Sequence, residues 1–162
     1  MKKSDALAKA LAEALAERAA AQTRLAELQG RLEASVLVQE GDEPAEDPAA
    51  LLAEADRVLE RLEHLVRAIN ATNAATPFDA GRTVTDAIAA RDTLARRQRF
   101  LAAVAGAAVP SSRFGRAEIK FVPTVDVRSL RAAADDAARA FRELDTRLQG
   151  LNWTTDLVEP QG

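Results

Sequence analysis

Apolar residues recur at steps of three and four along most of the chain, which is the spacing of one face of an α-helix. Prolines and short polar runs interrupt this pattern at a few places. It predicts helices at about residues 5–34, 48–71, 84–108 and 127–149, with an acidic loop at 40–47 and a C-terminal tail at 151–162.

The first predicted helix is the longest. Its apolar residues repeat from Leu7 to Leu32 with no proline between them. At 1.5 Å per residue it would measure about 45 Å and would extend beyond its neighbours. An exposed apolar overhang is best covered by another subunit, so we expect a homo-oligomer.

The other predicted helices carry recognisable start signals. Asp47 before Pro48 is typical of an N-cap followed by proline in the first turn. Thr83 and Asp126 stand in the same way before the third and fourth helices. Gly150 predicts the end of the fourth helix.

Residues 118–127 alternate with period two, which is typical of a strand. Because a lone strand leaves its backbone groups unpaired, this extended segment needs a partner. The nearest candidate in the chain is Val36–Val38. The alternatives, in order, are pairing across a symmetry axis and an irregular extended path over the helices.

Length and composition favour one helical domain. The chain has 162 residues, of which 48% are hydrophobic and only 4% aromatic, so its core must consist of aliphatic side chains and alanine. We predict an all-α fold, an antiparallel four-helix bundle covering residues 1–162, with a long first helix and one short extended segment at about 118–127.

Charge and missing motifs exclude several classes of function. The formal net charge is −3, so there is no global attraction to nucleic acid or anionic lipid. No apolar run approaches the length of a membrane span, and the N-terminus lacks the apolar core of a signal peptide. We therefore expect a cytoplasmic protein that binds neither nucleic acid nor membrane.

No cofactor or metal is predicted. The chain has no cysteine, and His64 is its only histidine. The acidic loop at 40–47 lacks the ligand spacing of an EF-hand.

Some polar residues fall on predicted helix faces that are otherwise apolar, namely Arg18, Arg91 and Gln98. A buried guanidinium must be paired. We favour a buried network that fixes helix register or subunit pairing. The alternative is a pocket for a small anionic ligand, with catalytic residues unknown and binding residues drawn from Asn70, Asn73, Arg82, Arg91, Glu118, Lys120 and Asp126.

Five strings of the sequence form a recognisable set: 38–48, 69–73, 81–86, 118–127 and 143–153. Together they resemble a family of small uncharacterised bacterial proteins labelled septicolysin-like, and the resemblance extends from about Leu7 to Leu157. It implies an all-helical, oligomeric body and carries over no catalytic residue.

The sequence thus leaves three hypotheses for function. The first is a homo-oligomeric binding or scaffolding module. The second is a small-molecule or metal-dependent enzyme that uses the polar cluster between helices. The third and weakest is membrane activity of the cytolysin type. Because the sequence contains no catalytic motif, we favour a protein that is not an enzyme.

Overall fold

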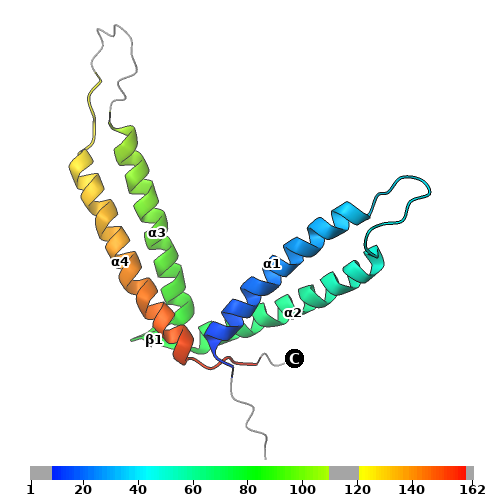
Figure 1. The fold of residues 1–162 in the computed structure, drawn as a ribbon. Helices are drawn as coiled ribbons and strands as arrows, with labels where there is room; N and C mark the ends of the chain where they lie inside the picture. Colours follow the sequence, from blue (N-terminus) through cyan, green and yellow to red (C-terminus); the bar gives the residue numbers. More distant parts are fainter. Residues whose placement is uncertain (1–8, 110–120, 160–162) are drawn as a thin grey trace, which may run out of the picture. The chain divides into compact units, whose positions relative to one another are not determined.

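The computed structural model describes residues 9–109 and 121–159. Within them lie four helices and one two-stranded sheet (Figure 1). The elements are α1 (Leu11–Ser35), α2 (Pro48–Ala75), β1 (Pro77–Asp79), β2 (Arg82–Thr83), α3 (Val84–Ala107) and α4 (Val127–Thr154). The predicted all-α class is confirmed.

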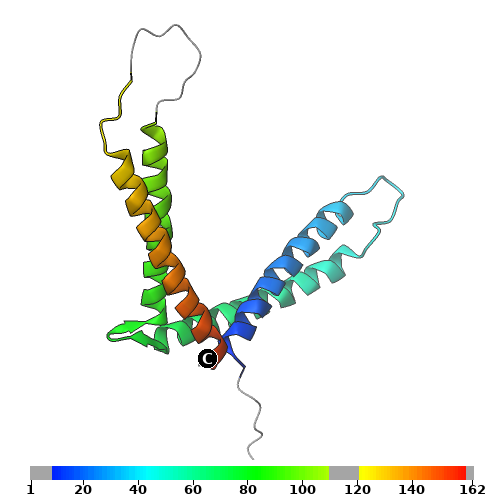
Figure 2. The ribbon, with the colours of Figure 1, turned by 60° about the vertical axis from the view of Figure 1, so that its left-hand side comes forward.

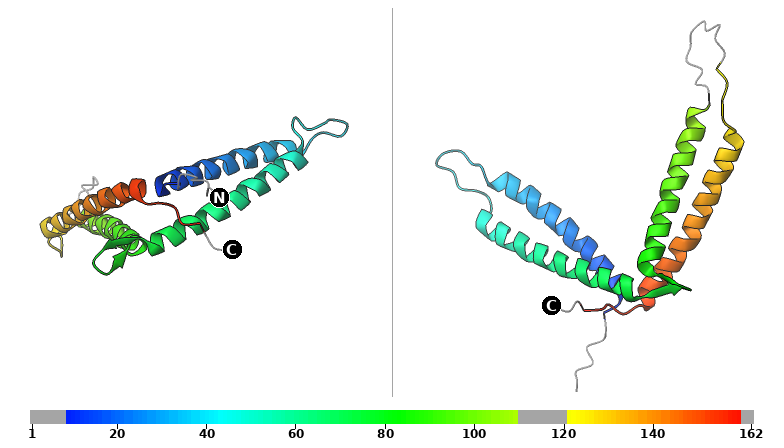
Figure 3. Two further views of the ribbon diagram at one scale, coloured as in Figure 1. Left: turned by 90° about the horizontal axis from the view of Figure 1, so that it is seen from below. Right: turned by 180° about the vertical axis from the view of Figure 1, so that it is seen from behind.

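The chain divides into two compact units. The first contains the described residues up to Thr76 together with those from Leu151 onward, and the second is Pro77–Gly150. Each unit is built on a pair of antiparallel helices, α1 with α2 and α3 with α4, which lie side by side in both panels of Figure 3. The predicted single domain stays a prediction.

The core of the first unit lies where α1 begins and α2 nears its end. Leu11 and Ala14 of α1 pack there with Leu65 and Ile69 of α2, and all four are at most 2% exposed. Leu157 from the C-terminal tail packs against this cluster. Burying each large aliphatic side chain contributes about 1.5–3 kcal/mol, so this cluster holds the two helices and the tail together.

The first helix begins at Leu11, later than predicted, because the backbone before it pairs with the tail. The Leu157 N–H donates to the Lys9 carbonyl at 2.8 Å, and the Leu11 N–H donates to the Thr155 carbonyl at 2.9 Å. α1 therefore has 25 residues against 28 in α2. The expected overhang of a longest first helix is wrong for the described residues.

A buried threonine fixes the end of the tail. The Thr72 hydroxyl donates to the Ala68 carbonyl at 2.7 Å and accepts the Val158 N–H at 2.9 Å. Thr72 is 0% exposed, so both of these hydrogen bonds are shielded from water. The tail is thus anchored to α2 by backbone and side chain alike.

The predicted N-caps are confirmed. The Asp47 carboxylate accepts the Ala49 N–H at 3.0 Å, and Asp126 accepts the N–H of Ser129 at 3.1 Å. Thr83 and Asp86 form a capping box at the start of α3. Gly150 does not end α4, which continues to Thr154.

In the second unit, a short hairpin leads into the helices (Figure 2). β1 and β2 are antiparallel, with Pro77 opposite Thr83. Gly81 in the turn has φ +82°, a conformation that side chains with a Cβ rarely adopt. The sequence marked this stretch only as a turn, so the hairpin was missed.

Four of the six buried residues in the described parts of α3 and α4 are alanines, and the other two are Val84 and Leu148. Ala87 and Ala105 of α3 and Ala134 and Ala137 of α4 are all buried.

The predicted strand at 118–127 is not found in its described part. Residues 121–125 are exposed and belong to no strand, whereas 118–120 lie outside the described residues. Its expected partner fails as well, because the Val36 N–H continues the helical pattern by donating to the Leu32 carbonyl at 3.0 Å. Leu37 is 86% exposed. Period-two alternation was therefore not enough to predict a strand, because no other strand among the described residues pairs with this segment.

Candidate functional site

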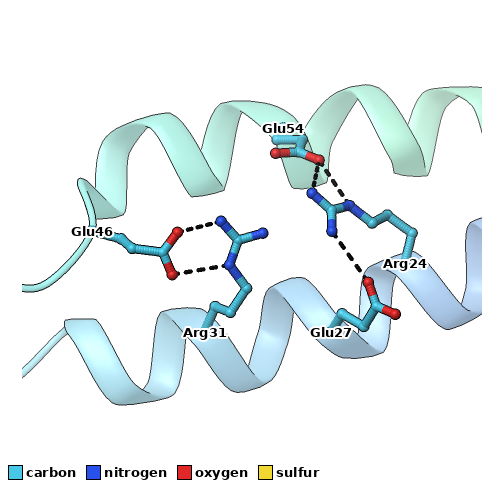
Figure 4. A network of polar contacts seen from close by, with 5 residues as sticks. All are labelled: Arg24, Glu27, Arg31, Glu46 and Glu54. Carbon is cyan, nitrogen blue, oxygen red and sulfur yellow. Dashed lines mark hydrogen bonds and ion pairs between the residues drawn. The ribbon is translucent and has the colours of Figure 1, made fainter.

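Ion pairs close one flank of the α1–α2 hairpin. Arg24 donates from Nε and Nη2 to the same Glu54 oxygen at 2.9 and 2.6 Å, and Nη1 contacts Glu27 at 3.1 Å (Figure 4). Seven residues later, Arg31 donates two hydrogen bonds to the Glu46 carboxylate, one from Nε at 2.9 Å and a shorter one from Nη2. The cations recur at the heptad spacing, so they line one side of α1.

Glu17 continues the same flank toward the core. Its carboxylate accepts from Arg61 of α2 and from Lys9. These hydrogen bonds, first from Arg61 and then from Lys9, lower the pKa of Glu17 from 4.5 to about 2. In the same way, the hydrogen bond from Arg31 lowers the pKa of Glu46.

The opposite flank of the hairpin is apolar, and we call it the open face. A groove of about 400 Å³ runs along it between the helices. Its lining includes Leu25, Leu32, Glu33 and Val36 of α1 and Leu52 and Ala55 of α2.

Large side chains continue the open face along α2. Leu52, Leu59 and Val66 follow one another at heptad spacing and are 54%, 46% and 37% exposed. They therefore form one stripe on the helix, about 21 Å long at the helical rise. A solvated helix usually carries polar residues at such positions, so this stripe is an exposed apolar surface.

The edges of the open face are mainly acidic. Glu33 is the one charged residue that lines the groove among the described residues. On α2, Asp56 and Glu63 stand one turn after Leu52 and Leu59, and Arg67 is the cation on that edge. The whole first unit has 9 Lys and Arg against 16 Asp and Glu, a formal charge of −7.

The second unit carries the opposite charge. It has 13 Lys and Arg against 9 Asp and Glu, a formal charge of +4. A shallow groove of about 340 Å³ between α3 and α4 is lined by Ala95, Gln98, Arg99, Ala138, Phe141 and Arg142. We call it the arginine groove, because its two charged lining residues are both arginines.

The predicted anion-binding residues are spread over the structure. Asn70 and Asn73 lie on α2 in the first unit. Arg82 and Arg91 lie in the second unit, and Glu118 and Lys120 fall outside the described residues.

Arg82 and Asp126 are not brought together. Asp126 caps the start of α4, whereas Arg82 and Arg147 both lie over the Phe78 ring, 5.6 and 4.2 Å from its centroid. The helix between Asp126 and Arg147 rises about 31 Å. One small ligand cannot reach both ends.

The two arginines predicted on apolar helix faces differ in whether their guanidinium groups are paired. Arg91 is paired, with Nη1 3.2 Å from Asp145 of α4 and Nη2 2.8 Å from Asp92. This fits the favoured interpretation of a register-fixing contact. The buried Nε of Arg18 has no hydrogen-bond partner in the described part of the chain.

The hairpin of the second unit forms a cluster that sequence reasoning missed. Arg82 donates from Nε to Asp79 at 2.8 Å, and Arg147 of α4 lies 3.6 Å from the same carboxylate. The hydrogen bond from Arg82 lowers the pKa of Asp79. Since Arg82 and Arg147 also lie over Phe78, the cluster attaches the hairpin to α4. Its signal in the sequence was Phe78 next to Asp79, with Arg82 three residues further on.

The described ranges contain neither a metal-binding cluster nor a membrane-spanning helix. His64 lies 3.3 Å from Glu159, and residues 9–109 and 121–159 contain no group of three or more His, Cys, Asp or Glu placed to hold a metal ion. None of the helices in this part of the chain combines the length and hydrophobicity that crossing a bilayer requires.

The chain is similar to proteins whose function is also unknown. A crystal structure of a functionally unknown conserved protein from Corynebacterium diphtheriae is 43% identical, with a TM-score of 0.89 over 93% of this chain and 99% of that one. No curated protein sequence matches. The resemblance to septicolysin-like proteins stays a prediction. Residues 18–157 match the family of unknown function DUF6847, and the chain belongs to that family.

Proposed function

We propose that this chain is a cytoplasmic homo-oligomer that acts as a binding or scaffolding module through its helical surfaces. The observation that carries the proposal is the open face of the α1–α2 hairpin. Leu52, Leu59 and Val66 lie there at heptad spacing and are more than a third exposed in a single chain.

The contrast between the two flanks of the hairpin supports this proposal. One flank is closed by charged side chains, from Glu17 with Arg61 to Arg31 with Glu46. Charges of this kind suit a flank that faces water. The other flank places leucine and valine at the equivalent positions, where exposure to water costs about 25 cal/mol for each Å² that a partner could bury.

The experiment is sedimentation velocity at micromolar concentration. The double variant Leu52→Gln/Leu59→Gln replaces the two leucines of the apolar stripe, at positions that are already about half-exposed. A matched control, Ala50→Gln/Arg57→Gln, changes two exposed residues of the same helix that lie off the stripe. We expect the wild type and the control to sediment as oligomers and the stripe variant as a monomer.

Circular dichroism separates loss of association from loss of folding. The stripe variant should keep the helical signal of the wild type, because the core at Leu65 and Ile69 is untouched. Oligomers of equal strength in all three proteins would contradict the use of this face, and a monomeric wild type would contradict the proposed function as a whole.

A further inference from the structure

The charge of the open face argues against its pairing with itself. A two-fold contact of the same patch would enclose Glu33 and Glu63 of both copies in one interface, where Arg67 is the cation that each edge on α2 offers to offset them. The first unit carries a formal charge of −7, so its surroundings add to the repulsion. Like charges brought together across an interface are unfavourable, and a cationic partner surface suits this face better.

The chain itself carries a surface of the required chemistry. The arginine groove has Arg99 and Arg142 along its lining and no carboxylate among the described residues that line it. Its apolar floor holds Ala95, Ala138 and Phe141.

We propose that the open face of one copy binds the α3–α4 hairpin of a second copy, with the arginine groove turned toward Glu33 and Glu63. This rests on the proposed homo-oligomer and names its contact. Leucines of the open face would cover the alanine-lined floor, and the arginine heads would meet the acidic edges. Because the two surfaces differ, the contact is heterologous and each copy offers one of each.

Charge reversal on each surface tests the pairing, because two variants that each repel their own copies should bind each other. The variant Glu33→Arg/Glu63→Arg makes the acidic edges cationic, and Arg99→Glu/Arg142→Glu makes the arginine groove anionic. Each variant alone then places like charges across the contact. Mixed together, the cationic open face of the first variant meets the anionic groove of the second, and the native pair of surfaces remains available as well.

The measurement is native mass spectrometry of each variant and of their equimolar mixture, at low salt. We expect each variant alone to bind itself about tenfold more weakly than the wild type, as two exposed charge pairs reversed together would give. The mixture should recover wild-type association as complexes that contain both masses. A control, Glu40→Arg/Glu43→Arg, applies the same charge change to the exposed loop after α1 and should associate like the wild type.

The outcomes separate this inference from the proposed function. Undiminished self-association of both variants, or weakening of each without recovery in the mixture, overturns the pairing of these two surfaces while the oligomer itself stands. A wild-type chain that is monomeric under the same conditions overturns the proposed function. The thermal melting temperatures of all the variants should match that of the wild type, which shows that a change in association does not come from unfolding.

Discussion

Arg24 and Glu54 join α1 to α2 through two hydrogen bonds to one carboxylate oxygen, at 2.9 and 2.6 Å. Around the same two helices, on the other flank, Leu25 and Ala55 line an apolar groove that no described residue fills. The hairpin is thus charged on one side and apolar on the other. This difference underlies the proposal that one flank faces water and the other faces a partner.

The ion pair of Glu17 should make the first unit sensitive to acid. Its pKa is lowered from 4.5 to about 2 in the folded chain, so its contribution is fully present above pH 4.5 and is lost as the pH falls toward 2. Because the side chain is 35% exposed, we expect the effect to be only about 0.5 kcal/mol. Urea unfolding of wild type and Glu17→Gln at pH 7 and about pH 2.5 measures it. A difference between the two proteins that is as large at the lower pH would contradict the assignment.

Leu65 should be among the most sensitive core positions of the first unit. It is 0% exposed and packs with Leu11 and Ile69, so Leu65→Ala should lower the free energy of unfolding by about 2–5 kcal/mol. Leu59→Ala on the open face serves as the control. At a protein concentration that keeps the chain monomeric, it should cost less than about 1 kcal/mol. Equal losses in chemical denaturation would mean that the core is misplaced.

Thr83 should matter for the start of α3. Its hydroxyl accepts the Asp86 N–H at 3.3 Å, and its own N–H is accepted by the Asp86 carboxylate at 2.8 Å. Thr83→Ala should destabilise the chain by about 1 kcal/mol, whereas Thr83→Ser, which keeps the hydroxyl, should be close to neutral. Thermal melting distinguishes the two, and an Ala variant as stable as the Ser variant would argue against the capping box.

Gly81 should resist substitution although it is exposed. Its φ of +82° lies in the left-handed region, and open space surrounds the position where a Cβ would stand. Gly81→Ala should therefore cost about 1 kcal/mol through backbone strain alone. Gly106→Ala in helical α3, which also has open space, should instead stabilise the chain slightly. A neutral Gly81→Ala in denaturant unfolding would show that this turn has another conformation.

The elements that the sequence predicted well are those with local signals. Asp47, Thr83 and Asp126 each cap the helix expected of them, because an N-cap needs only its own side chain and the next few N–H groups. The four-helix, all-α class followed from periodicity and alanine content. Gly150 was wrongly predicted to end α4, because the sequence does not distinguish a glycine within a helix from a glycine that terminates one.

Features that depend on distant residues could not be predicted. The start of α1 is set by the tail residues Thr155 and Leu157, which are remote in sequence. The strand-like alternation at 118–127 found no partner in its described part, because strand pairing is decided elsewhere in the chain. The open face was hidden for the same reason. In the sequence, Leu52 and Leu59 recur at helical spacing just as core residues do, and only the structure shows that Leu51 and Leu65 are buried while Leu52 and Leu59 are exposed.

The association state of the wild-type chain tests the central claim most directly. Light scattering coupled to size exclusion should be run over a dilution series from about 100 to 1 µM. With a subunit of 17.3 kDa, we expect a mass of two or more subunits at the upper concentrations, falling toward one subunit on dilution. A mass of one subunit throughout the series would contradict the account.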